Sequence, residues 1–275
     1  MRLVSFAKLA PALICTAALL LSATPAVADV ETFATFTSIT PIKNIRFVNS
    51  GTSASRTTNA QVYTTSSATA NAPGTAKVYF SFLQDGLSSF INNVVADYTL
   101  TATVAKGQSA GEFGSVLIQP LISGTMTFRS TSVITLTSPY FHTTTYQAGA
   151  NLLTVEFGTS MTGNRNGSTT TLSGSTAAGN AIAFSSDFLD FSNVSNADLS
   201  TTFSALSNLL QINASTANSS LSTFRATAGG QFSSDPAPLV LDVLPEPLSW
   251  VMMVTGFAML GTAIRHQQRR ARPAV

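Results

Sequence analysis

Between residues 29 and 244, apolar side chains recur at every second position, and this period most restricts the folds open to the chain. A period of two puts apolar groups on one face of a β-strand, whereas a helix needs a period near 3.6. Thr and Ser fill many intervening positions, as on a β-surface that is uncharged but wet. We expect these residues to face inward on successive strands: Val78, Phe80 and Phe82; Tyr98, Leu100, Ala102 and Val104; Met126 and Phe128; Ile134 and Leu136; Leu153, Val155 and Phe157; Leu199, Thr201 and Phe203; Phe224, Ala226 and Ala228.

Turn residues separate these runs. Ala-Pro-Gly-Thr at residues 72–75 suits a type II turn, and Asn-Gly at 166–167 is a strong hairpin signal. With Ala-Gly-Asn at 178–180 as the next turn, residues 151–186 predict a three-stranded meander. Residues 87–95 could form a short helix, but their β-branched side chains disfavour it. The pattern predicts an all-β fold, an antiparallel β-sandwich of jelly-roll or immunoglobulin-like type.

Charge is divided unevenly along the chain. Only 9% of the residues are charged, against about 25% in an ordinary soluble domain. Residues 29–244 carry 8 Lys and Arg against 11 Asp and Glu. The pI near 8.9 therefore belongs to the two ends, and the body is mildly acidic. We expect no nucleic-acid partner, because a phosphate backbone needs a clustered basic face.

Residues 1–28 have the order of a secretory signal peptide. Arg2 and Lys8 precede an apolar core at residues 9–21, and Ala26 and Ala28 then form a small-x-small cleavage pattern. We expect signal peptidase to remove this segment; the alternative is an uncleaved anchor, for which the apolar run is short. The single cysteine lies inside it, so disulfides and Cys-ligated metals are excluded from the mature chain.

The carboxyl end combines a proline-rich entry, an apolar run and a basic tail. Two prolines flank Glu246 and keep that stretch extended, because proline does not join helix or sheet interiors. Residues 248–264 contain no charge and are just long enough to predict a transmembrane helix. Trp250 suits the membrane interface, and the arginines of residues 265–275 predict a cytoplasmic tail. The arginines are Arg265, Arg269, Arg270 and Arg272.

These tail residues resemble the PEP-CTERM sorting signal in its PEPxxW subtype. Pro245, Glu246 and Pro247, the Trp three residues on, the short apolar helix and the Arg-rich end stand in that family's order. The resemblance covers residues 245–275 and implies recognition by a membrane protease, an exosortase, in a bacterium with an outer membrane. The same module is also called the ice-binding protein C-terminal domain, a name for the tail alone. The alternative is a membrane anchor that is never cut.

One short motif matches a catalytic pattern. Residues 107–111 read Gly-x-Ser-x-Gly around Ser109. A serine hydrolase needs that serine on a strand-to-helix turn, with a histidine base and an acid. Residues 112–116 are not helical in pattern, and His142 is the only histidine of the body, with Glu112 the only acid between it and Ser109. We therefore expect a loop or hairpin here and no catalytic residue.

Acidic and amide side chains gather between residues 187 and 198, at Asp187, Asp190, Asn193, Asn196 and Asp198. Calcium takes such oxygen ligands, but the spacing matches no calcium loop. We expect solvated turn residues rather than a metal site, and binding of a cation by the three aspartates stays an open alternative. No cofactor is predicted, since neither a Walker loop nor a dinucleotide fingerprint is present.

Sugar binding is weakened by the aromatic composition, because the only Trp lies in the tail. It remains open through the five tyrosines, while the Phe residues alternate with polar ones and fit a core. The short Thr runs lack the fixed repeat that an ice-binding array needs. The tyrosines are Tyr63, Tyr79, Tyr98, Tyr140 and Tyr146.

The chain is thus divided into a signal peptide (1–28), an extracellular all-β domain (29–232), a linker or last edge strand (233–244) and the sorting signal (245–275). We expect a non-enzymatic protein of the cell surface or extracellular matrix. It would be tethered to the inner membrane as a precursor and then processed by an exosortase. Two alternatives are an exopolysaccharide-binding β-sandwich and a secreted hydrolase in which two acids, such as Asp187 and Asp190, act as a pair.

Overall fold

A computed structural model describes residues 30–49, 58–137, 143–213, 219–241 and 255. Within these ranges the chain forms antiparallel strands and one short 3₁₀ turn, η1 (Thr176–Ala178), which confirms the predicted all-β class. The strands are β1 (Glu31–Ser38), β2 (Ile45–Asn49), β3 (Thr58–Thr64), β4 (Ala76–Phe82), β5 (Val94–Ala105), β6 (Gly111–Phe113), β7 (Val116–Ser130), β8 (Ile134–Thr137), β9 (Thr143–Tyr146), β10 (Asn151–Asn164), β11 (Thr170–Ser175), β12 (Ala181–Ser185), β13 (Leu189–Asp190), β14 (Asn196–Ser204), β15 (Phe224–Asp235) and β16 (Leu239–Val240).

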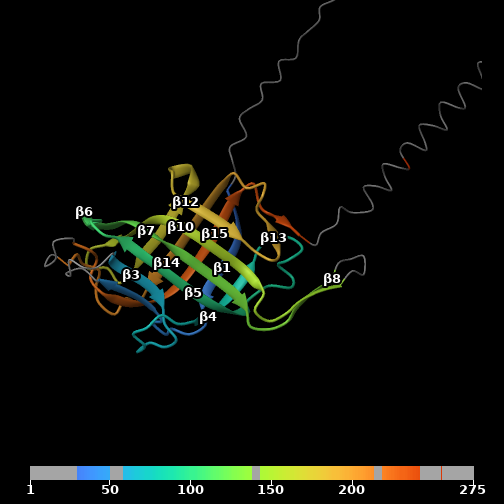
Figure 1. Cartoon of the computed structure of the whole chain (residues 1–275), viewed down its shortest axis with the longest axis horizontal. Coiled ribbons are helices and arrows are strands. Elements are labelled where there is room, and N and C mark those ends of the chain that lie inside the picture. The colour runs from blue at the N-terminus through green and yellow to red at the C-terminus, as the bar shows by residue number, and fades with distance from the viewer. Residues whose placement is uncertain (1–29, 50–57, 138–142, 214–218, 242–254, 256–275) are drawn as a thin grey trace, which may run out of the picture.

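The main sheet closes on itself (Figure 1). Antiparallel pairing runs from β15 through β2, β3, β5, β7, β10, β11 and β14 and returns to β15. Each strand of this ring pairs with the strand that follows it in the ring, and the ring strands succeed one another in chain order from β2 to β15. Strands outside the ring, such as the β8–β9 hairpin, are inserted between them. A closed sheet leaves few strand edges unpaired, which limits pairing with other chains.

Several ring positions hold two strands end to end. β1 and β2 follow one another along one edge of β15, and β4 and β3 do the same along β5. β11 and β12 both pair with β10, on either side of the turn at Gly179, which has a positive φ of 84°. The predicted meander over residues 151–186 is therefore wrong in its last step, because the turn bends the chain without reversing it.

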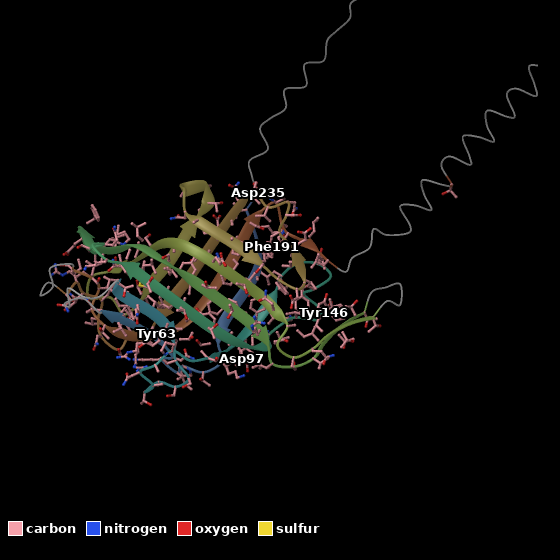
Figure 2. The ribbon with its side chains drawn as sticks, in the orientation of Figure 1. Tyr63, Asp97, Tyr146, Phe191 and Asp235 are labelled. Atoms are coloured by element: carbon pink, nitrogen blue, oxygen red, sulfur yellow. The ribbon has the colours of Figure 1, made fainter. Side chains whose placement is uncertain are left out.

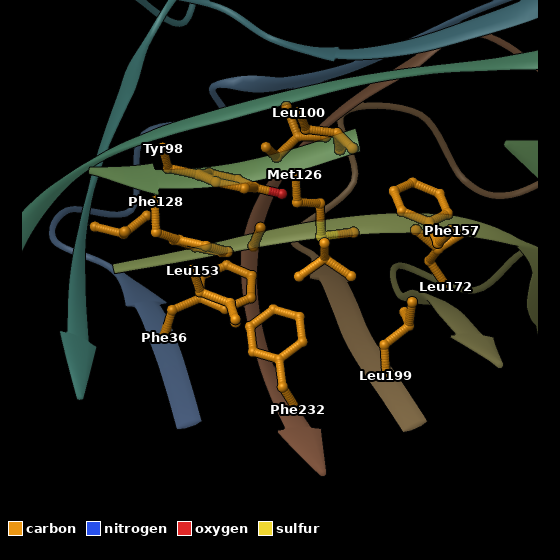
Figure 3. Close-up of a cluster of buried hydrophobic side chains, with 14 of the residues drawn as sticks. Phe36, Tyr98, Leu100, Met126, Phe128, Leu153, Phe157, Leu172, Leu199 and Phe232 are labelled. Carbon is orange, nitrogen blue, oxygen red and sulfur yellow. The ribbon is translucent and has the colours of Figure 1, made fainter. Parts of the chain in front are cut away.

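The residues predicted to face inward fill the ring (Figure 3), except Ile134 and Leu136, which lie on β8 of the separate β8–β9 hairpin. Every one of them is at most 7% exposed, and the group extends from Val78 to Ala228. Tyr98 stacks on Phe128 with ring centroids 4.8 Å apart, and Phe128 meets Phe232 of the opposite wall at 5.6 Å. The two walls therefore pack face to face across an apolar core, as the layers of a sandwich do.

Residues 87–95 do not form a helix. Leu87 and Ile91 are fully buried in a single helical turn closed by the bond from Ile91 N to Leu87 O at 2.8 Å. Val94 then begins β5, because pairing with β4 and β7 stabilises β-branched residues better than a helix would.

Residues 233–241 continue the fold rather than leaving it. β15 runs to Asp235, and β16 pairs with β13, with Leu241 N donating to Phe188 O at 3.1 Å. Residues 233–241 therefore hold the end of β15 and the two-residue strand β16, while residues 242–244 lie outside the described residues. Among the described residues, no helix is both long and apolar enough to cross a membrane.

Candidate functional site

The predicted processing residues lie outside the described part of the chain. This holds for the signal peptide and for the sorting signal, of which the structure describes only Thr255. Their assignment therefore stays a prediction from the sequence. The residues concerned are Ala26, Ala28, Pro245, Glu246, Pro247, Trp250, Arg265, Arg269, Arg270 and Arg272.

Ser109 lies in an exposed loop between β5 and β6. The chain then enters the short β6 and β7, so the strand-to-helix turn of a serine nucleophile is missing at this serine. Glu112 forms an ion pair with Arg165 at 2.8 Å, and His142 lies outside the described residues. Residues 107–110 form the expected loop, and Gly111 already begins β6.

Two aspartates of the acidic stretch accept hydrogen bonds from within the protein. Asp187 accepts from Asn151 N at 2.7 Å, and Asp190 accepts from the backbone and hydroxyl of Ser192 at 2.8 and 3.0 Å. Asp198 lies on β14 with one carboxylate oxygen buried and without a hydrogen bond in the described structure. The part of the chain that the structure describes contains no group of three acids, histidines or cysteines able to hold a metal.

Most tyrosines are unsuited to stacking on a sugar. Tyr98 is fully buried, Tyr63 is 6% exposed, and Tyr146 packs on Phe188 with centroids 4.2 Å apart. Tyr79 is 36% exposed, and Tyr140 lies outside the described residues. The aromatic route to sugar binding is therefore reduced to Tyr79 in the described structure.

A polar groove crosses the outer face of β1, β15 and β14. It is open to solvent, has a volume of about 740 Å³, and is lined largely by Ser, Thr and Gly residues. Gly229 is one of the lining residues, and its Cα partners are Thr37 on β1 and Thr202 on β14. A residue without a side chain between two threonines produces the hollow. Within the described structure, the side chains of five lining residues make no hydrogen bond with the protein: Thr37, Thr40, Ser200, Thr202 and Gln231.

Two arginines lie beyond one end of this groove. Arg225 precedes Thr227 by two residues on the outer face of β15, and its Cα partner on β2 is Arg46. Figure 2 shows Tyr63 of the same region far from Asp235 at the other end of β15. The two guanidinium groups thus lie on adjacent strands, on the face that carries the groove.

Neutral oxygens hold both guanidinium groups. Arg46 Nη1 donates to Tyr63 Oη at 3.0 Å and to the carbonyl of Asn71 at 2.9 Å. Arg225 Nη2 donates to the carbonyl of Ala70 and to Asn71 Oδ1, the latter at 3.0 Å. The segment between β3 and β4 therefore folds over the pair and supplies backbone and amide acceptors.

The arginine pair has no anionic partner among the described residues. The ion pairs found there are Lys77–Asp97 at 2.6 Å and Arg165–Glu112. Arg225 Nη1 is buried and makes no hydrogen bond in the described structure. Burial and the neighbouring charge of Arg46 lower the pKa of Arg225 below its usual value. Such an arrangement can accept an anion.

Sequence reasoning missed this site. Phe224 and Ala226 were expected to face inward, which turns Arg225 outward, but no local signal joins it to Arg46 across the length of the chain. No family model, curated protein or solved structure matches this chain. Function is therefore argued from the residues of the chain itself.

Proposed function

We propose that this chain is an exported, non-enzymatic bacterial protein of the cell surface or extracellular matrix, processed at its carboxyl end by an exosortase. The observation that carries the proposal is the order of features in residues 245–275: paired prolines around Glu246, Trp250, an apolar run and four arginines. A secretory signal at the other end supports the same route.

Each segment has a physical task in this route. The amino-terminal segment directs export and is removed after Ala28, and residues 248–264 then stop in the inner membrane with the arginines on the cytoplasmic side. The extended stretch at residues 245–247 remains accessible to the exosortase, because proline keeps it out of regular structure. Cleavage releases the body towards the surface.

The geometry of the body supports tethering at one end. Glu31 of the first strand and Leu239 of the last strand line the same surface depression. Glu31 also pairs with Ser234, the neighbour of Asp235, and Figure 2 shows Asp235 far from Tyr63, so chain entry and chain exit lie together at the end of β15 away from Tyr63. A tail leaving from there would keep the groove and the arginine pair clear of the membrane.

Recognition of exopolysaccharide is a second candidate function, favoured by the polar groove on β1, β15 and β14. Carbohydrate sites need converging hydroxyl and amide groups, and five lining side chains of this kind make no hydrogen bond in the described structure. A secreted hydrolase has no such support. Turnover of an ester or a glycoside by the purified chain, abolished by Ser109→Ala, would favour it instead.

Intact mass measurement tests the processing route. In wild-type cells we expect a chain lacking residues 1–28 and a carboxyl-terminal segment, and in cells lacking the exosortase we expect the carboxyl-terminal segment to be retained. Replacing both Pro245 and Pro247 by Ala is expected to cause the same retention.

A matched control is Pro238→Ala, since residues 236–238 also read Pro-x-Pro but lie within the folded body beside β16. This variant is expected to be cut normally. A wild-type chain that keeps residues 245–275 in full would contradict the proposal.

A further inference from the structure

We infer that the groove and the Arg46–Arg225 pair form one binding site for an acidic polysaccharide. The guanidinium groups would bind a carboxylate or sulfate group, while the hydroxyl and amide side chains of the groove would bind neutral sugar hydroxyls. The inference deepens the second candidate function, on which it rests, by naming the class of glycan and the residues that select it.

The first argument is charge. Arg46 and Arg225 are cross-strand neighbours, and like charges in that position repel each other. The body as a whole is acidic, with 8 basic against 11 acidic residues between positions 29 and 244. Two adjacent cations held by neutral oxygens are therefore unusual for this body. An anion bound between them would offset their repulsion.

The second argument is unused donors. Neutral acceptors engage Nη1 of Arg46 and Nη2 of Arg225. In the described structure Nη1 of Arg225 is buried and unbonded, and a buried donor without an acceptor costs free energy. Because this Nη1 is shielded from solvent, an anionic oxygen between the two guanidinium groups supplies the missing acceptor only when the neighbouring groups move aside. Tyr63 and Asn71 hold the groups in place for it.

The third argument is alignment. Arg225, Thr227, Gly229 and Gln231 occupy alternate positions of β15 on its outer face. At about 3.4 Å per residue these positions extend over roughly 20 Å, which suits a linear polymer better than a small ion. The polymer would lie over Gly229, between Thr37 and Thr202, with its charged group at the arginine pair.

The groove is poorly suited to other classes of ligand. Of the larger apolar residues only Ile39 and Pro41 line it, at one end, so a lipid or an apolar peptide has no continuous apolar surface there. A nucleic acid needs a row of cations and stacking aromatics along its path, whereas the groove itself is lined by uncharged residues. A polyhydroxylated chain with occasional acidic groups fits both parts of the site.

Binding of three polymers to the full chain, purified in detergent, tests this inference. The probes are polygalacturonate, which carries carboxylates, dextran sulfate, which carries sulfates, and neutral dextran. We expect one or both acidic polymers to bind at least tenfold more tightly than dextran, and the binding to weaken with salt. Comparison of the two acidic polymers identifies the anionic group that the arginines prefer.

Two substitutions test the residues. Arg46→Gln is expected to weaken binding of the acidic polymer roughly tenfold, since a charge-assisted contact is lost. Its control is Arg165→Gln, which removes the same charge from an arginine paired with Glu112 and should change affinity less than twofold.

Gly229→Leu should block the groove with its side chain. The backbone tolerates a side chain here, because a Cβ at this position meets no atom closer than 3.4 Å. Its control is Gly158→Leu on β10, where the nearest atom lies at 3.7 Å.

Three results would overturn the inference: equal affinity for dextran and the acidic polymers, no binding of any polymer, or equal effects of Arg46→Gln and Arg165→Gln. Thermal unfolding verifies that each variant is folded. If Gly229→Leu is unfolded, the comparison of Arg46→Gln with Arg165→Gln tests the inference by itself. A chain that is cut normally but binds nothing refutes only the glycan site. A chain that binds acidic polymer but keeps its tail refutes only the sorting proposal.

Discussion

Successive residues of β15 face two different environments. Phe224, Ala226 and Phe232 point into the ring and are at most 1% exposed, whereas Arg225 and Gln231 point outward to the arginine pair and the groove. The inner row contributes apolar burial, and the outer row carries polar groups and charge. One strand with a period of two therefore separates stability from binding, and substitutions on its two faces should have different consequences.

The largest contrast is expected between two adjacent residues. Phe232→Ala removes a ring that packs against Phe128 and Phe36, and should lower the free energy of unfolding by about 3–5 kcal/mol. Gln231→Ala, on the outer face, should change it by less than about 0.5 kcal/mol. Urea unfolding of the two variants measures both values. Similar losses would contradict the assignment of the two faces.

The paired glycines give a smaller contrast. A Cβ on Gly230 would lie 2.6 Å from the carbonyl oxygen of Ser200 and 2.8 Å from the ring of Phe36, so Gly230→Ala should cost about 1–3 kcal/mol. A Cβ on Gly229 meets nothing closer than 3.4 Å, and Gly229→Ala should be neutral or slightly stabilising. Midpoints of urea unfolding distinguish the two. Equal destabilisation would show that the groove floor is also packed.

The smallest expected effect concerns a polar atom on the inner face. The hydroxyl of Tyr98 is buried without a hydrogen bond in the described structure, and burial raises the pKa of Tyr98. Tyr98→Phe should therefore raise the free energy of unfolding by about 1 kcal/mol.

The pH dependence gives an independent check on Tyr98. Because the folded state favours the neutral phenol, its contribution to stability is present below a pH of about 10 and is lost as the pH rises further. The Tyr98→Phe variant should lose less stability between pH 9 and 11 than the wild type. An identical alkaline loss in both proteins would contradict burial of this hydroxyl.

The division between the two faces could be predicted from the sequence because it depends on local alternation alone. The inward positions from Val78 to Ala228 follow from neighbours two residues apart, and all are buried. Closure of the ring could not be predicted in this way. It depends on pairing of β2, together with β1, with β15 near the other end of the body, and such long-range register leaves no local pattern.

The candidate site could not be predicted from the sequence either, because it also depends on long-range strand pairing. Arg46 and Arg225 become neighbours only when β2 pairs with β15, and the groove exists because Gly229 lies between threonines of two other strands. The turn at Gly179 also misled the prediction, since a glycine with positive φ can redirect a strand as well as reverse it. Residues that become neighbours only through tertiary structure are not indicated by any local sequence pattern.

Cell fractionation combined with mapping of the carboxyl terminus tests the central proposal most directly. Export and processing predict that the surface or extracellular fraction contains chains without the segment 248–275, and that cells lacking the exosortase accumulate the uncut chain in the inner membrane. Recovery of the full-length chain from the cytosol, ending at Val275, would contradict the proposal.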